Sequence, residues 1–174
     1  MLIDDDVKHA LIHEAGHATA YSVLQHQSAG IAVLREVLKF CNLVAPDGPV
    51  NGEAAGSAAE VLFFEHYDLD AATAHRVGLG MTEEEYRKQV DLTVVFLSPY
   101  KKQIYEIYKQ LLGEIIWRET LADFPILTGP VGGMNLPTGG TFTMLMTPDE
   151  IATVIANKQP AEGDGTRGAS LYQI

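Results

Sequence analysis

The chain has 174 residues, of which 47% are apolar and 20% charged, and its net charge is −11. This composition can build a hydrophobic core and excludes a wholly disordered chain, and the length favours a single domain. The negative charge argues against binding to nucleic acid or to an anionic membrane surface. Cys41 is the only cysteine, which excludes an internal disulfide and a zinc finger. With no apolar run long enough to span a bilayer and no signal-peptide pattern, we expect a cytoplasmic protein.

Capping residues and apolar spacing predict a mostly α fold with a minor strand element. A first helix is expected over residues 5–25, and one or two short strands over residues 30–44. The Gly- and Pro-rich residues 128–146 are expected to form a long loop, with a short hairpin within it as an alternative. Capping residues and prolines predict further helices over residues 51–66, 68–78, 82–97 and 99–121, and a short helix from Thr147. A Thr82–Glu85 capping box is expected at the start of the third of these, and Ser98 is expected to cap the fourth. We expect one domain over residues 1–159, followed by a polar tail over 160–174.

The sequence His13-Glu14-Ala15-Gly16-His17 lies within the first predicted helix. Residues four apart on a helix lie about 40° apart around its axis, so both imidazoles can reach one Zn²⁺ ion. Glu14 lies about 100° from His13, so its carboxylate flanks the metal and can act as general base and then general acid. Burying these three ionisable groups without a partner would be costly. The pattern therefore predicts a metal site with a catalytic Glu14.

A catalytic zinc site needs a third protein ligand and leaves the fourth position for water. His9 shares the helix face of His13, but three ligands from one straight helix rarely close a tetrahedron. Glu60 lies in the middle of a predicted helix. Asp68 and Asp70 also have the ordinary interpretation of helix N-caps. The spacing leaves the choice open among these four residues and Glu65, His66 and His75.

Three segments resemble the FtsH-type ATP-dependent zinc metalloproteases. The stretch ALIHEAGHATAYSVL resembles the HEAGHA helix of that family. The segment Gly-Ser-Ala-Ala-Glu at 56–60 resembles its Gly-Gly-Arg-Ala-Ala-Glu segment, and Asp-Leu-Asp-Ala-Ala-Thr at 68–73 resembles its Asp-Leu-x-x-Ala-Thr segment. The resemblance covers residues 8–24 and 52–78 and is faint elsewhere.

The resemblance implies a helical, zincin-like peptidase domain built around the HExxH helix. It implies that His13, His17 and Asp68 hold the zinc and that Glu14 is catalytic. The sequence departs from the family in several respects: it has no G-x-x-x-x-G-K-[ST] phosphate loop, no transmembrane segment and no Gly/Thr-rich stretch before Asp68, and residues 122–146 look like an insertion.

We therefore expect a zinc-dependent endopeptidase that cleaves flexible peptides or unfolded protein, or that a separate ATPase partner feeds, with a homo-oligomer as one possible form. One alternative is a metal-binding but catalytically silent regulatory or binding module. Another is an HExxH regulatory protease with Glu60 as its third ligand. A purely structural helical protein in which the motif occurs by chance would bind no metal.

Overall fold

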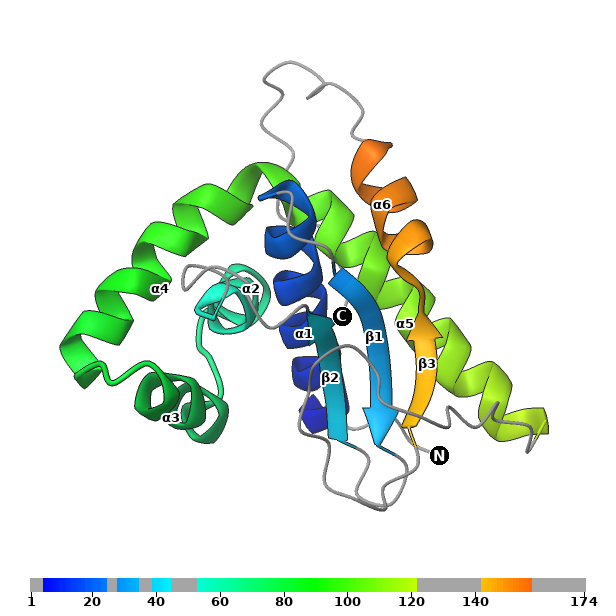
Figure 1. Cartoon of the computed structure of the whole chain (residues 1–174), viewed down its shortest axis with the longest axis horizontal. Helices are drawn as coiled ribbons and strands as arrows, with labels where there is room; N and C mark the ends of the chain where they lie inside the picture. The colour runs from blue at the N-terminus through cyan, green and yellow to red at the C-terminus, as the bar shows by residue number, and fades with distance from the viewer. Residues whose placement is uncertain (1–4, 25–27, 35–38, 45–52, 122–141, 158–174) are drawn as a thin grey trace.

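The computed structural model describes residues 5–24, 28–34, 39–44, 53–121 and 142–157, and this part of the chain is mostly helical (Figure 1). The fold-class prediction of a mostly α chain with a minor strand element is confirmed. The described elements are, in chain order, α1 (Asp5–Val23), β1 (Ser28–Leu34), β2 (Lys39–Val44), α2 (Ala55–Phe64), α3 (Leu69–Gly78), α4 (Glu83–Leu97), a 3-10 turn (Ser98–Tyr100), α5 (Lys101–Leu121), β3 (Phe142–Met146) and α6 (Pro148–Ala156). None of the helices described is both long and apolar enough to cross a lipid bilayer.

The three strands form one antiparallel sheet in the order β2-β1-β3. Ala32 in the central strand pairs with Cys41 of β2 and with Met144 of β3. The segment 128–146, expected to be a loop with room for a short hairpin, ends in the strand β3 at residues 142–146, and this strand pairs with the distant β1. A strand that short is stabilised by its partner β1, which lies far away in the sequence. Residues 122–141 and the predicted tail over 160–174 lie outside the described residues.

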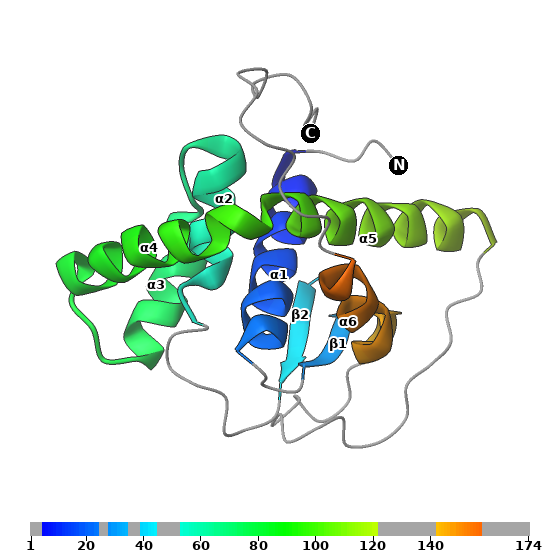
Figure 2. The same ribbon diagram turned by 90° about the horizontal axis from the view of Figure 1, so that it is seen from above.

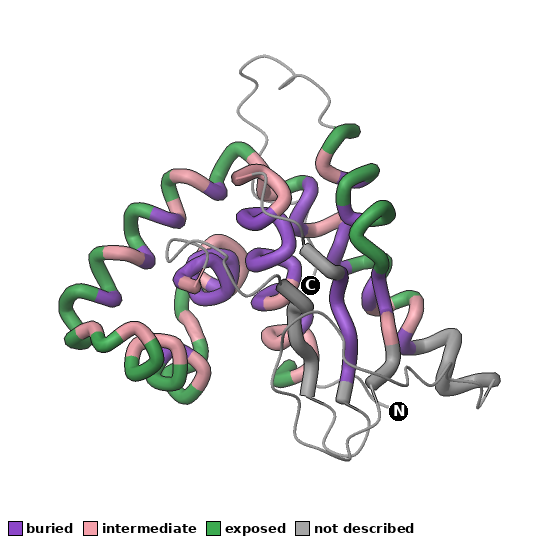
Figure 3. The backbone as a smooth tube through the Cα atoms, viewed as in Figure 1, coloured by how far each residue is buried: buried purple, intermediate pink, exposed green. Residues whose placement is uncertain are grey.

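Helix α1 is the central element, with the sheet on one side and α2, α3 and α4 on the other (Figures 1 and 2). Its buried residues share the core with α2, as the purple segments of Figure 3 show. A Cβ atom at Gly16 would lie 2.5 Å from both the carbonyl oxygen of Ala55 and the Cβ of Ala59. The glycine within the HExxH segment therefore allows α1 and α2 to touch, which fixes α2 beside the two histidines.

The boundary between α4 and α5 differs from the prediction at Ser98. We expected Ser98 to cap the following helix, but its hydroxyl donates backward to the carbonyl oxygen of Val94 at 2.7 Å. Ser98 thus ends α4, and Pro99 lies in the 3-10 turn that leads into α5. The Thr82–Glu85 capping box at the start of α4 is confirmed by hydrogen bonds in both directions.

Candidate metal centre

Three histidines from two helices converge on one point. His13 and His17 lie four residues apart on α1, and His75 reaches them from α3. The Nε2 atom of His13 lies 3.0 Å from Nε2 of His17 and 3.2 Å from Nε2 of His75, and the ligand atoms of all three lie within 4.8 Å of one another. Nitrogens bound at 2.0–2.1 Å around a tetrahedral zinc ion are about 3.3 Å apart. The spacing of the histidine cluster therefore fits a single metal ion.

Two carboxylates fix the orientation of two of these rings. His13 donates its Nδ1–H to Oε1 of Glu60 at 2.5 Å, and His75 donates its Nδ1–H to Oε2 of Glu53 at 2.8 Å. Because an ionised carboxylate only accepts, the hydrogen sits on Nδ1 and the lone pair on Nε2. While both rings are neutral, the two Nε2 lone pairs face each other and repel. A metal cation between them, or a proton on one Nε2 atom, removes that repulsion. This carboxylate–histidine arrangement is typical of metal ligands in proteins.

The electrostatic surroundings of the cluster favour a positive charge. Burial lowers the pKa of His13, but the hydrogen bond to Glu60 and the negative charges of Glu14, Glu60 and Asp68 outweigh it, so the pKa is raised above its usual 6.5. The hydrogen bond to His75 lowers the pKa of Glu53, which keeps that carboxylate ionised. Surroundings that favour a protonated imidazole also favour a bound metal cation.

Glu60 is almost completely buried and connects three parts of the site. Its Oε1 accepts from His13, and its Oε2 accepts the backbone N–H of Asp68 at 2.5 Å, just before α3 begins. The Nδ1 atom of His9 lies 3.6 Å from the same Oε2. A buried carboxylate requires such partners because removing it from water is costly. The structure therefore places Glu60, an alternative third ligand in the sequence analysis, behind His13 as a residue that orients the ring.

Gly56 of α2 lies directly against the His13 ring. A Cβ atom at this position would overlap with the ring, including its Nε2 atom. Only glycine therefore lets α2 lie directly against the metal-facing edge of His13. Gly56 opens the second segment that resembles the FtsH-type proteases, and the close contact gives a physical reason for a glycine there.

Asp68, the third ligand implied by that resemblance, is the N-cap of α3. Its Oδ1 accepts the backbone N–H groups of Asp70 at 2.7 Å and Ala71 at 3.0 Å, and the residue is exposed. The group of three potential ligands contains His75 and not Asp68. Asp68 is still near enough for its charge to raise the pKa of His13.

The remaining candidates lie outside the histidine cluster. The ring of His9 stacks on Phe64 with centroids 3.7 Å apart, and His66 bonds to the carbonyl oxygen of Phe64 through Nδ1. Glu65 caps the C-terminus of α2 in a left-handed conformation. Asp70 is exposed in the first turn of α3.

Glu14 follows His13 directly and is half-buried. Its negative charge contributes to the raised pKa of His13 and, together with burial and the charge of Glu53, to that of Tyr21. The ring of Tyr21 lies parallel to that of His17, with centroids 6.1 Å apart. Helical spacing puts Glu14 about 100° around α1 from His13, so its side chain flanks the cluster.

Glu53 is a component of the site that the sequence analysis did not identify. It lies two residues before α2, in no motif, and it contacts the cluster through its hydrogen bond with His75. Comparison with protein-family models, with curated proteins and with solved structures found no match. The resemblance to the FtsH-type proteases accordingly stays a prediction.

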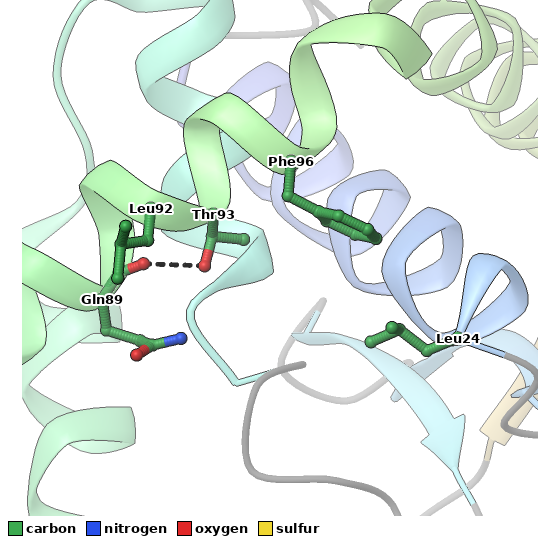
Figure 4. A pocket seen from close by; sticks show the side chains of 5 residues that line it. All are labelled: Leu24, Gln89, Leu92, Thr93 and Phe96. Atoms are coloured by element: carbon green, nitrogen blue, oxygen red, sulfur yellow. Dashed lines mark hydrogen bonds between the residues drawn. The ribbon is translucent and has the colours of Figure 1, made fainter.

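An open pocket of about 350 Å³ is lined by Leu24, just after α1, and by side chains of α4 (Figure 4). Leu24, Leu92 and Phe96 supply its apolar lining, and Thr93 donates its hydroxyl hydrogen to the carbonyl oxygen of Gln89. None of the lining residues belongs to the histidine cluster. The chemistry of the site therefore lies with the histidines and their carboxylates.

Proposed function

We propose that the chain is a zinc-dependent metallopeptidase whose metal is held by His13, His17 and His75. The single observation that carries the proposal is the convergence of three Nε2 atoms at metal-ligand spacing. Glu14 lies next to His13, in the position of the general base in an HExxH helix. The proposal keeps the zinc and the catalytic residue implied by the sequence, and it takes His75 in place of Asp68 as third ligand.

The donor set favours zinc and a catalytic type of site. Imidazole nitrogens suit zinc, as they do copper, iron and nickel, whereas calcium and magnesium take oxygen ligands. The HExxH spacing favours zinc among these metals. Structural zinc sites are closed by four protein ligands, and catalytic sites use three. Among the described residues, the group contains three side chains and no fourth. That arrangement supports an open position facing substrate.

A bound zinc ion would polarise the substrate carbonyl and lower the pKa of a coordinated water. His13, His17 and His75 would hold it, with Glu60 and Glu53 fixing two of the rings through their Nδ1–H groups. Glu14 takes a proton from the attacking water as the new C–O bond forms. It then delivers that proton to the amide nitrogen as the C–N bond breaks.

The proposed substrates are flexible peptides or unfolded protein. Such chains can adopt the extended form that a metallopeptidase cleaves, and the sequence carries no phosphate loop with which to unfold a folded substrate itself. A separate ATPase that feeds the site is part of the same proposal, on the basis of the family resemblance.

Cleavage of a fluorogenic peptide library by the zinc-loaded chain tests the proposal. Glu14→Gln should retain zinc and lose roughly 10²- to 10⁴-fold in kcat, because the proton can no longer be moved. Glu84→Gln, at an exposed position of α4 that pairs with Lys88, is the matched control and should leave kcat unchanged. Zinc binding without cleavage by the unaltered chain would instead indicate a silent metal-binding module.

A further inference from the structure

Helix α3 is attached to the rest of the molecule by very little apolar packing. Ala72 is its one buried residue, whereas Leu69 and Val77 expose most of their surface to solvent. Figure 3 shows α3 largely in the colours of exposed and intermediate residues, in contrast to α1 and α2. An alanine side chain buries too little surface to hold a ten-residue helix in place. Isolated helices of this length are also marginal in water.

Polar contacts around the histidine cluster also attach α3 to the rest of the molecule. At its start, the backbone N–H of Asp68 donates to Glu60, which also binds His13. Near its end, His75 donates to Glu53 and points its Nε2 atom at His13. Both ends of the helix are therefore tied to α1 or α2 through groups that surround the proposed metal position.

We infer that metal binding is what holds α3 against α1, so that the metal site is completed only when the ion is present. The inference rests on the metal centre of the proposed function and adds a metal-dependent conformational step to it. His75 is the only member of the cluster on α3, so the ion would form the link between the two helices. Metal binding and local folding are coupled in this way when a site is incomplete in the metal-free state.

The metal-free chain should therefore keep its core and lose the fixed position of α3. Opening of α3 would release His75 and break the hydrogen bond between Asp68 and Glu60. His13 and His17 would remain together, because both lie on α1. Helix α5, whose Ile104, Ile107 and Leu111 are fully buried in the core, should not respond to the metal.

Hydrogen–deuterium exchange of the full chain, measured with zinc and with a chelator, tests this inference. If opening of α3 requires loss of the His75 ligand, free zinc at 100 times its Kd should slow exchange in residues 69–78 by up to about 100-fold. Exchange in residues 101–115 should not change. Trypsin gives a second measurement, because Arg76 is the single trypsin site within α3 and should be cut faster without zinc.

Variants separate this inference from the proposed function. His75→Ala should exchange rapidly in α3 whether or not zinc is added, while the matched control His66→Ala, an exposed histidine outside the cluster, should behave as the unaltered chain. If zinc binds but exchange in α3 is the same with chelator, the inference is overturned and the metal centre stands. If no zinc binds, both fail.

Discussion

The Nδ1–H of His13 donates to the buried carboxylate of Glu60 at 2.5 Å, and the second oxygen of that carboxylate accepts the backbone N–H of Asp68. One side chain of α2 thus orients a histidine of α1 and also anchors the start of α3. The contact with His13 sets the direction of its ring, and the contact with Asp68 couples the site to α3, the helix with little apolar packing. This explains why a glutamate can be almost fully buried in the middle of α2.

Glu60→Gln should weaken zinc binding by about 10- to 100-fold, the usual cost of altering a group that orients a metal ligand. The amide keeps the shape of the side chain but removes the negative charge that favours a cation. Zinc affinity is measured by competition with a chelating dye. Glu84→Gln serves as the control, and equal affinity in both variants would contradict the assigned role of Glu60.

Gly56→Ala should abolish or severely weaken zinc binding, because the added Cβ would overlap with the His13 ring. Displacement of that ring moves Nε2 away from His17 and His75. Gly113→Ala is the matched control, since a Cβ there meets nothing within 4 Å and alanine is the better helix former. Metal content and thermal unfolding are compared for both variants. Normal zinc content in Gly56→Ala would show that the contact does not constrain the site.

Two substitutions of Asp68 separate capping from ligation. Asparagine caps a helix about as well as aspartate does, whereas alanine removes the cap at a cost of about 1 kcal/mol. If Asp68 is a cap, the Asp68→Asn variant should retain both its zinc and its stability. The Asp68→Ala variant should mainly loosen the attachment of α3 to the rest of the molecule. Loss of zinc from both variants would instead make Asp68 a ligand, as the family resemblance implies.

Tyr86→Phe should lower stability at neutral pH by about 1 kcal/mol, because the buried hydroxyl bonds to Ser57 at 3.0 Å. Burial raises the pKa of Tyr86 to about 12, against the opposing effect of the Ser57 hydrogen bond, and the unfolded value is about 10. The folded chain thus holds this proton more tightly, so the contribution of the hydroxyl is complete below pH 10. It is lost as the pH rises from about 10 to about 12.

Urea unfolding of both proteins at several pH values measures this effect. The stability difference between the unaltered chain and Tyr86→Phe should shrink as the pH rises above about 10. A difference that stays constant over that range would show that Tyr86 does not titrate with a raised pKa.

The parts of the fold that depend on local chemistry could be predicted from the sequence. The capping box at Thr82 and the helix around His13 and His17 depend on residues within one or two turns. The presence of β3 could not be predicted, because its pairing with β1 joins segments far apart in the chain. The Ser98 hydroxyl can bond forward or backward along the chain, and the local sequence does not decide between the two.

In the candidate site, too, only the features that depend on nearby residues could be predicted from the sequence. Two imidazoles on one helix follow from a spacing of four residues, but no spacing rule links His75, 58 residues after His17, to them. Asp68 fits both a cap and a ligand in the sequence, and only the hydrogen bonds to Asp70 and Ala71 show its capping role. Glu53 carries no sequence signal, since its position matters only once α3 lies against α2.

The metal content of the purified chain tests the central claim most directly. Native mass spectrometry of protein prepared without chelator and then offered zinc should find about one ion per chain, and His75→Ala should lose it while His66→Ala keeps it. The absence of zinc from the unaltered chain, or its full retention in His75→Ala, would contradict the metal centre described above.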